Sequence, residues 1–564
     1  MDRQQALEIL TAPSMPLEMT DIEVYGKIRR AYKNAPQSLR ELFTLNLSNE
    51  TFLVLDKERY SFNEAWYIAS AIGNGLVSEY GIKKGDRVAI CMRNFPEWII
   101  AFQAITSIGA IAVAMNSLWQ AEELIYGIND SGCKLLIADQ ERVNLLSKIQ
   151  IPCDLLLVRG DVGDTHSRWE DMRQNNDGSQ MPEITIDAID DVIILYTSGS
   201  TGRPKGVVSS NLAVASALLS WELSLQIWMM VRDTPLEPPK HQSAGLLAVP
   251  LFHATGSHAV FLSAFRSQTK LVLTRKWDPA EAAELIEKEQ ISSFIAPPAM
   301  TSDLVYHAKQ GGYDLSSLML VGGGGAARAP EQVKNIDATF GNALPNTGWG
   351  MTETNAIGTA IAGELYLERP NSSGLPAAVL DIRIADEDGN ELSANQRGEV
   401  QVRGTSMFRG YWNKPQATAE SYVDDWFQTG DVGYLDNEGY LFIVDRIKDM
   451  VIRGGENIGC GEIEAALLEH PCVREACVYS VPDDRLGEEV GATIFCINAV
   501  DEIELRSFLS NQLAKFKIPR YFNFTDESLP RTASGKIFKL EIRNQSLDKF
   551  LDRSKFTTLI QSDS

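Results

Sequence analysis

The segment with the clearest chemistry is a run of small polar residues at 196–206, YTSGSTGRPKG. It directly follows DVIILY (191–196), an apolar run typical of a buried strand. Hydroxyls and glycine amides after a strand offer many donors with little bulk, and Lys205 adds a positive charge, so the segment suits a polyphosphate. It is not a Walker A loop, because Lys205 lies between Pro204 and Gly206. The residues expected to bind phosphate are Thr197, Ser198, Gly199, Ser200, Thr201, Gly202 and Lys205.

Five further segments follow this loop: GGGGAA (322–327), GWGMTET (348–354), TGD (429–431), DRIKD (445–449) and LPRTASGK (529–536). In type and order the six segments resemble the motifs of the adenylate-forming superfamily, which contains acyl- and aryl-CoA synthetases, peptide-synthetase adenylation domains and beetle luciferases. The resemblance implies that a carboxylic acid is activated as an acyl-adenylate and then transferred to a thiol. It also implies ATP, Mg²⁺ and coenzyme A as cofactors and co-substrates.

The family resemblance implies roles for individual residues. Lys536 would bridge the acid carboxylate and the α-phosphate, Thr352 would reach that phosphate, and Glu353 would hold Mg²⁺ together with Thr201. Lys448 would be the hinge between two domains. The residues implied to bind nucleotide or CoA are Gly323, Gly324, Ala326, Trp349, Gly350, Met351, Asp431, Arg446, Gly454 and Gly455. Trp349 stands where relatives commonly have Tyr. On their own, Trp349 could equally be a core aromatic and Glu353 an exposed carboxylate at a helix start.

Two segments indicate the branch of the family. PLFHATG (250–256) lacks an acidic residue that could pair with a substrate ammonium, which argues against an amino acid. VIRGGENI (451–458) resembles the strand that lines the pantetheine tunnel of CoA ligases. The expected acid-pocket walls are His253, Gly256, Ala299, Met300, Gly324, Gly350 and the helix 221–230. Their apolar character favours a medium- or long-chain fatty acid. An aromatic acid, or an adenylating enzyme with another acceptor, remains the alternative.

The elements that must carry these residues alternate between strands and helices. Short apolar runs at 85–92, 110–115, 133–139, 191–196, 270–275 and 292–296 predict strands, and 97–107, 121–129 and 279–289 predict helices. This pattern predicts an α/β fold: a large multi-lobed N-terminal domain with doubly wound parallel sheets and a small β-barrel-like subdomain after about residue 380. A small α+β C-terminal domain follows. We expect the boundary between residues 1–446 and 447–564.

Composition limits the functional classes. The 564 residues carry a net charge of −23, which argues against nucleic-acid binding. The seven cysteines form no C-x-x-C pair, and the N-terminus lacks a signal peptide, so we expect a cytoplasmic protein. The uncharged segment 98–119 reads as a buried helix and strand, so no transmembrane segment is expected. The sequence leaves both a monomer and a homodimer open.

Overall fold

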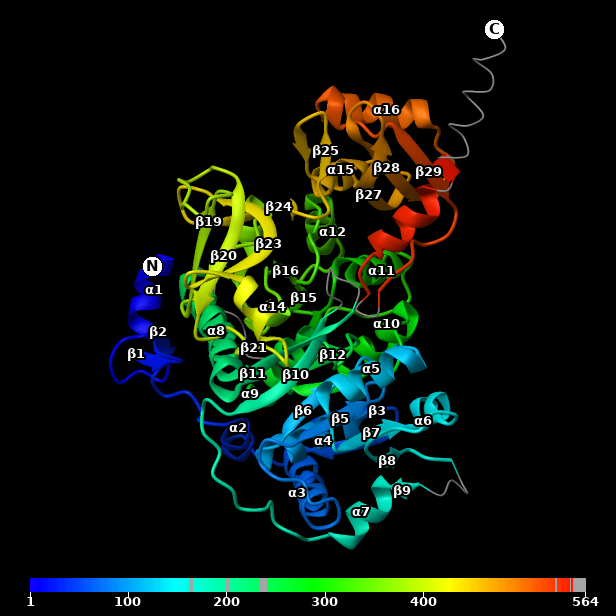
Figure 1. Ribbon diagram of the computed structural model, residues 1–564. Helices are drawn as coiled ribbons and strands as arrows, with labels where there is room; N and C mark the ends of the chain where they lie inside the picture. Colours follow the sequence, from blue (N-terminus) through cyan, green and yellow to red (C-terminus); the bar gives the residue numbers. More distant parts are fainter. Residues whose placement is uncertain (162–165, 198–202, 233–240, 533–534, 548, 551–564) are drawn as a thin grey trace.

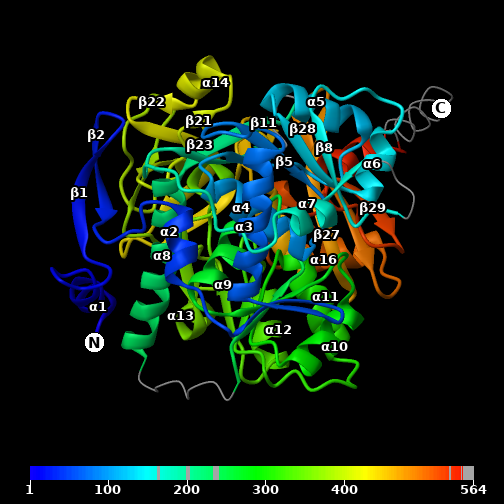
Figure 2. The same cartoon turned by 90° about the horizontal axis from the view of Figure 1, so that it is seen from below.

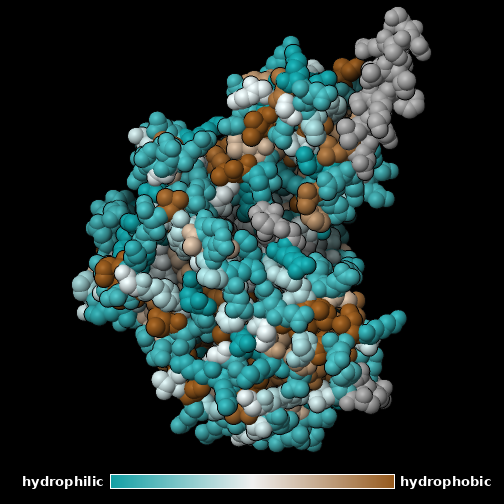
Figure 3. All heavy atoms as spheres, viewed as in Figure 1, coloured by the Kyte–Doolittle hydropathy of each residue, from teal (hydrophilic) through white to brown (hydrophobic). Residues whose placement is uncertain are grey.

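The computed structural model describes residues 1–161, 166–197, 203–232, 241–532, 535–547 and 549–550 (Figure 1). Two large sheets, a small half-barrel and a C-terminal α+β region make up the fold. The predicted α/β class, with its β-rich part and its α+β C-terminal domain, is confirmed. The face in Figure 3 is mainly hydrophilic, as expected for so highly charged a chain.

The first large sheet contains the strands that flank the phosphate segment. Its order is β21-β11-β10-β6-β5-β7-β8-β9, and β10, β6, β5, β7 and β8 run parallel. The strands are β5 (Arg87–Cys91), β6 (Ile111–Ala114), β7 (Leu135–Asp139), β8 (Asp154–Val158), β9 (Ser167–Arg168), β10 (Asp191–Thr197), β11 (Lys205–Ser210) and β21 (Gly410–Tyr411). Because β10 and β11 pair in antiparallel fashion, with Thr197 opposite Lys205, these two residues of the phosphate segment lie side by side at one end of this sheet.

The second large sheet positions two more motifs, the 322–327 and 348–354 segments. Its order is β18-β17-β16-β15-β14-β12-β13-β3-β4, with a parallel centre. The strands are β3 (Thr51–Leu55), β4 (Glu58–Ser61), β12 (Ala244–Leu247), β13 (Lys270–Leu273), β14 (Ser293–Ile295), β15 (Leu320–Gly322), β16 (Leu344–Thr347), β17 (Thr359–Ala362) and β18 (Leu375–Pro376). The 322–327 and 348–354 segments follow the carboxyl ends of the neighbouring strands β15 and β16, so they meet at one edge.

Helices fill the space between and around the sheets. They are α2 (Leu39–Leu45), α3 (Phe62–Ser78), α4 (Pro96–Ser107), α5 (Ala121–Ser131), α6 (Gln140–Leu146), α7 (Trp169–Asn175), α9 (Ser263–Arg266), α10 (Pro279–Glu289), α11 (Pro298–Ala308), α12 (Pro330–Thr339) and α13 (Gly363–Glu368), with a π-helix at Thr255–Leu262. One buried apolar cluster joins residues of both sheets through α3 and α4, for example Val88, Trp98 and Val272. The predicted helix 97–107 and strand 110–114 are confirmed as α4 and β6.

The half-barrel and the C-terminal region follow. The half-barrel contains β19 (Leu380–Ala385), β20 (Gly398–Gly404), β22 (Tyr422–Val423), β23 (Trp426–Leu435) and β24 (Leu441–Arg446), with α14 (Pro415–Glu420). The C-terminal sheet contains β25 (Val451–Arg453), β26 (Glu456–Ile458), β27 (Val473–Asp483), β28 (Gly487–Cys496) and β29 (Tyr521–Thr525), with α15 (Cys460–Leu468) and α16 (Glu502–Ser510). The boundary at residue 446 stays a prediction.

Helix α8 (Asn211–Val231) packs against an N-terminal layer that the sequence did not predict. This layer consists of α1 (Arg3–Leu10) and the hairpin β1 (Met19–Val24)–β2 (Lys27–Tyr32), which Figure 2 shows at one edge of the molecule beside α8. Among the described helices, α8 alone is long and apolar enough to cross a membrane by length and composition. Half of its apolar window is buried within the protein, as in a core helix.

Candidate active site

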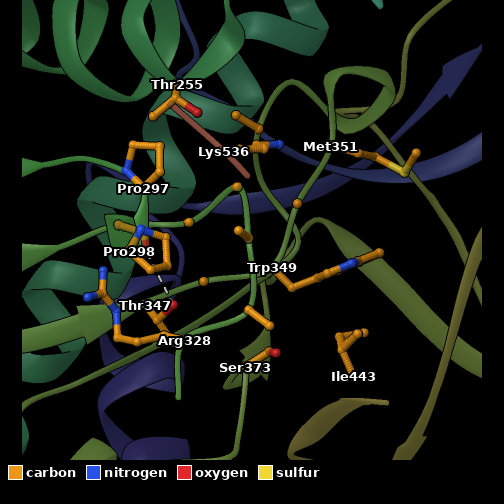
Figure 4. A pocket seen from close by; sticks show the side chains of 18 of the residues that line it. Thr255, Pro297, Pro298, Arg328, Thr347, Trp349, Met351, Ser373, Ile443 and Lys536 are labelled. Atoms are coloured by element: carbon orange, nitrogen blue, oxygen red, sulfur yellow. Dashed lines mark hydrogen bonds between the residues drawn. The ribbon is translucent and has the colours of Figure 1, made fainter. Parts of the chain in front are cut away.

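The predicted motifs meet around one large cavity between the two large sheets, the half-barrel and the C-terminal region. Its volume of about 3320 Å³ is several times that of a usual ligand pocket. Figure 4 shows the side chains of Lys536 and Trp349 projecting into it, with Pro297 and Pro298 on its wall. The predicted site residues that line it are Thr197, Lys205, His253, Ala299, Gly323, Gly324, Ala326, Trp349, Gly350, Met351, Thr352, Glu353, Asp431, Arg446, Lys448 and Lys536. Ser198, Gly199, Ser200, Thr201 and Gly202 lie outside the described residues.

Backbone contacts of the described neighbours fix the place of Lys536 at the cavity. The Thr532 N–H donates to the Lys536 carbonyl at 2.7 Å, and Gly535 adopts a left-handed φ of +81°, which glycine tolerates. The side chain passes directly over Gly325, where a Cβ would lie 3.2 Å from the Lys536 Cε. Burial lowers the pKa of Lys536 to about 8, helped by the charge of Arg446 and opposed by Asp431. Lys536 therefore loses its proton much more readily than an exposed lysine.

Asp431 is held by two donors. The Trp349 indole N–H donates to its Oδ2 at 2.7 Å, and the Arg446 Nε lies 3.0 Å from its Oδ1. Register explains the second contact, because Asp431 on β23 stands opposite Arg446 on β24. The carboxylate is 4% exposed, so this double pairing satisfies a buried charge. The resemblance implied that Trp349 binds nucleotide, but the sequence did not predict its hydrogen bond to Asp431.

Glu353 lies in a short 3-10 turn, Thr352–Thr354, just after the Gly350–Met351 segment. Its carboxyl group is buried, and the Tyr411 hydroxyl donates to its Oε1 at 2.9 Å. Burial raises the pKa of this carboxyl, while the Tyr411 hydrogen bond and the charges of Arg446 and Lys205 oppose that shift. A buried carboxylate facing a cavity is suited to a cation, and the alternative of an exposed helix-start carboxylate is wrong for Glu353.

A network that the sequence did not reveal anchors both ends of the phosphate segment. At its first residue, the Tyr196 hydroxyl donates to Asp130 at 2.9 Å; near its other end, the Tyr126 hydroxyl donates to the Pro204 carbonyl at 3.0 Å. Lys414 neutralises Asp130 at 2.8 Å. The sequence offered little sign of these contacts. Tyr196 belongs to the phosphate segment, and Lys414 ends the segment RGYWNK (409–414).

Helix α8 presents several apolar side chains to the acid end of the cavity. Leu218, Trp221, Leu225 and Trp228 line it, and the last three lie in the predicted helix 221–230. Glu222 of the same helix also lines the cavity and pairs with Arg266 at 2.9 Å. Burial lowers the pKa of His253 to about 3, with a further contribution from the charge of Lys536, so its imidazole is neutral at ordinary pH. No hydrogen-bond partner for its buried Nε2 lies among the described residues.

Four predicted binding residues do not line the cavity. Gly256 packs on the chain instead, where a Cβ would lie 2.2 Å from the Pro250 carbonyl oxygen, and Met300 lies beneath Gly535. Gly454 and Gly455 form the turn between β25 and β26 in the C-terminal region, and the Gly454 N–H donates to the Leu486 carbonyl at 2.8 Å. In this arrangement Lys536 occupies the site while the 451–458 hairpin lies outside it.

A small set of contacts holds the C-terminal region in this orientation. The Asp303 carboxylate on α11 lies 3.7 Å from an Arg474 nitrogen and 3.6 Å from an Arg531 nitrogen. The Arg474 guanidinium also lies over the Tyr306 ring, 3.8 Å from its centroid. These contacts are charged and partly exposed, as in interfaces that can open.

Comparisons with known proteins agree with this geometry. Residues 45–412 match the family described as AMP-binding enzyme, and residues 462–536 match the AMP-binding enzyme C-terminal domain. The chain is 31% identical to a 2-succinylbenzoate–CoA ligase of Bacillus velezensis (86% of this chain, 93% of the relative) and 31% identical to a long-chain-fatty-acid–CoA ligase of Mycobacterium tuberculosis (83% and 90%). A feruloyl-CoA synthase of Amycolatopsis is 32% identical over 84% of this chain and 91% of the relative.

Comparison with solved structures also finds CoA ligases of this fold. ATP-bound MatB from Rhodopseudomonas palustris superposes with a TM-score of 0.77 at 27% identity, covering 91% of this chain and 99% of that one. The o-succinylbenzoate CoA synthetase of Bacillus subtilis, in complex with ATP and a magnesium ion, gives 0.74 at 25% identity, covering 90% and 99%. The chain therefore belongs to the AMP-binding, adenylate-forming enzyme family and is an AMP-forming acid–CoA ligase, which acts through an acyl-adenylate.

Proposed function

We propose that this ligase activates an apolar monocarboxylic acid, in particular a medium- or long-chain fatty acid, and transfers it to coenzyme A. The observation that carries the proposal is the wall that α8 contributes to the cavity. Leu218, Trp221 and Leu225 present apolar surface there, and His253 stays neutral. An alkyl chain gains free energy by leaving water for such a surface.

ATP would bind at the opposite end of the cavity. Trp349 offers a ring for adenine, Asp431 offers acceptors for the ribose hydroxyls, and Lys205 offers a charge for the phosphates. No group of three or more His, Cys, Asp and Glu within the described ranges could hold a metal ion. This fits Mg²⁺, which is usually held by one or two carboxylates together with the phosphates of the substrate. Glu353 would be the protein carboxylate, and bound Mg²⁺ would withdraw charge from the phosphates.

In the first step a substrate carboxylate oxygen would bond to the α-phosphorus as the bond to pyrophosphate breaks. The Lys536 ammonium would offset the negative charge that develops there, and Thr352 would orient the α-phosphate. Positioning and charge would supply the rate, since this step needs little proton transfer.

For the second step we propose that residues 447–564 rotate about Lys448 relative to residues 1–446. Lys536 would then leave the cavity, and the 451–458 hairpin with Gly454 and Gly455 would take its place and line the route of the CoA thiol. The exposed position of that hairpin and the charged contacts around Asp303 support this exchange.

The test is acid-dependent pyrophosphate release with ATP and Mg²⁺ across C2 to C18 fatty acids and a set of aryl acids, with and without CoA. We expect turnover to rise with chain length into the medium or long range, and acyl-CoA to form only when CoA is present. A preference for short dicarboxylic acids would overturn the proposed substrate class. Pyrophosphate release without CoA consumption would overturn the proposed acceptor.

An aryl acid is the second candidate. Trp221 and Trp228 place two indole rings on the same wall, and aromatic substrates stack on such rings. The aryl acids in the same panel separate the two candidates.

A further inference from the structure

Tyr411 stands between the two groups that the proposed function assigns to the metal and the phosphates. Its hydroxyl donates to the Glu353 Oε1 at 2.9 Å. On its other side, the Lys205 Nζ lies 4.8 Å from the centroid of the Tyr411 ring. The six sequence motifs leave this residue without a role.

The backbone around Tyr411 is bonded to both neighbours. Strand β21 pairs with β11, which begins at Lys205, and the Trp412 N–H donates to the Gly206 carbonyl at 2.7 Å. Three residues before Tyr411, the Phe408 N–H donates to the Glu353 carbonyl at 2.8 Å. The Tyr411 ring is therefore fixed relative to the strand of Lys205 and to the turn of Glu353.

We propose that Tyr411 is a positioning residue, which orients the Glu353 carboxylate for Mg²⁺ and keeps that carboxylate apart from the Lys205 ammonium. This inference rests on the proposed metal role of Glu353. With Oε1 held by the hydroxyl, the rotation of the carboxylate is fixed and its second oxygen is directed to a cation.

The ring has a separate effect. Its face attracts the Lys205 ammonium, and among the described residues no salt bridge joins Lys205 to Glu353. A direct pair would neutralise both groups, whereas the separated charges remain available, one to a metal ion and one to a phosphate.

The test is Tyr411→Phe, which removes the hydroxyl and keeps the ring under Lys205. Mn²⁺ is the probe, and its binding is followed by electron paramagnetic resonance with ATP present and no acid. We expect the Kd of Mn²⁺ to rise about tenfold or more, the usual range for loss of a partner behind a metal ligand. Binding of ATP in EDTA should stay unchanged, and the loss in steady-state adenylation should appear in the KM for Mg²⁺ more than in kcat.

Tyr422→Phe is the matched control, because Tyr422 belongs to the same aromatic cluster and does not hydrogen-bond to Glu353. Unchanged Mn²⁺ binding in Tyr411→Phe, or an equal loss in the control, would overturn the inference.

Glu353→Gln separates the metal role proposed for Glu353 from the positioning role proposed for Tyr411. If it leaves Mn²⁺ binding intact, the metal role of Glu353 fails. If it weakens binding, adding Tyr411→Phe should weaken it no further, and a full additional loss would overturn the role of Tyr411.

Discussion

The two ends of the cavity are built in different ways. At the nucleotide end, side chains hold one another: Asp431 is bonded by Trp349 and Arg446, and Glu353 by Tyr411. At the acid end, α8 offers apolar surface with few hydrogen bonds, and its shape depends on what packs behind it.

The difference separates chemistry from specificity. A hydrogen-bonded carboxylate has one useful orientation, so the residue types that perform adenylation must recur at fixed places. An apolar wall only has to exclude water and fit a shape, and many side chains can do this. Substitutions at the first end should therefore change catalysis for every acid, whereas those at the second should change which acid is used.

The largest effect is expected from Lys536→Ala. Loss of a cation that offsets charge on the α-phosphate should slow acid-dependent pyrophosphate release by at least about 100-fold. Thioester formation from supplied acyl-adenylate should be nearly intact, because Lys536 is proposed to have left the site in that step. Lys515→Ala, at an exposed position of the same region, is the control. Equal loss of both half-reactions would contradict the exchange.

Trp349→Phe tests the nucleotide end. The ring would still stack, but Asp431 would lose a hydrogen bond to a charged group, and the KM for ATP should rise about tenfold. Trp412→Phe is a matched control, since the buried Trp412 indole N–H has no hydrogen-bond partner among the residues that the structure describes. If both variants raise the KM equally, the bond to Asp431 is not the cause.

The pH dependence should follow the Lys536 ammonium. The pKa of about 8 means that this group is charged below that pH and neutral above it. Adenylation, measured as kcat/KM for ATP, should fall roughly eightfold between about pH 7.5 and about pH 9. Lys536→Arg keeps the charge over this range, so its lower activity should lack the alkaline decline. An identical decline in that variant would assign it to another group.

The smallest effect is expected at the acid end. Trp221→Ala should widen the apolar wall and shift the ratio of kcat/KM between long and short acids about fivefold, slightly below the effect of one methylene in a closely fitting apolar pocket. The KM for ATP should not change. Met229→Ala, half-exposed on the same helix, serves as the control. A change in the KM for ATP as large as the change in acid preference would break the distinction between the two ends.

The sequence predicted the two ends unequally well. Buried strands and motif residues were readable because Asp431 lies on a strand and Glu353 in a short 3-10 turn, each with its motif neighbours beside it in the sequence. The layer of α1 and the β1–β2 hairpin could not be predicted from the sequence. No local pattern indicates that Tyr32 hydrogen-bonds to Ser220, which lies on α8 and is far away in the chain. Tyr411 and Asp130 were missed because their partners lie 58 and 66 residues away in the chain. Gly256 was predicted as a pocket wall because a small residue suits either a pocket or a close backbone contact, and here it makes the contact.

The position of the 451–458 hairpin has a kinetic consequence. While Lys536 lies in the site, no residue of that hairpin lines the cavity, so on the proposed function the path for the thiol is not yet assembled. On the proposed function, CoA becomes a productive substrate only after pyrophosphate has departed. The order of events would thus be set by geometry, and initial rates measured against ATP and CoA together should give parallel double-reciprocal lines.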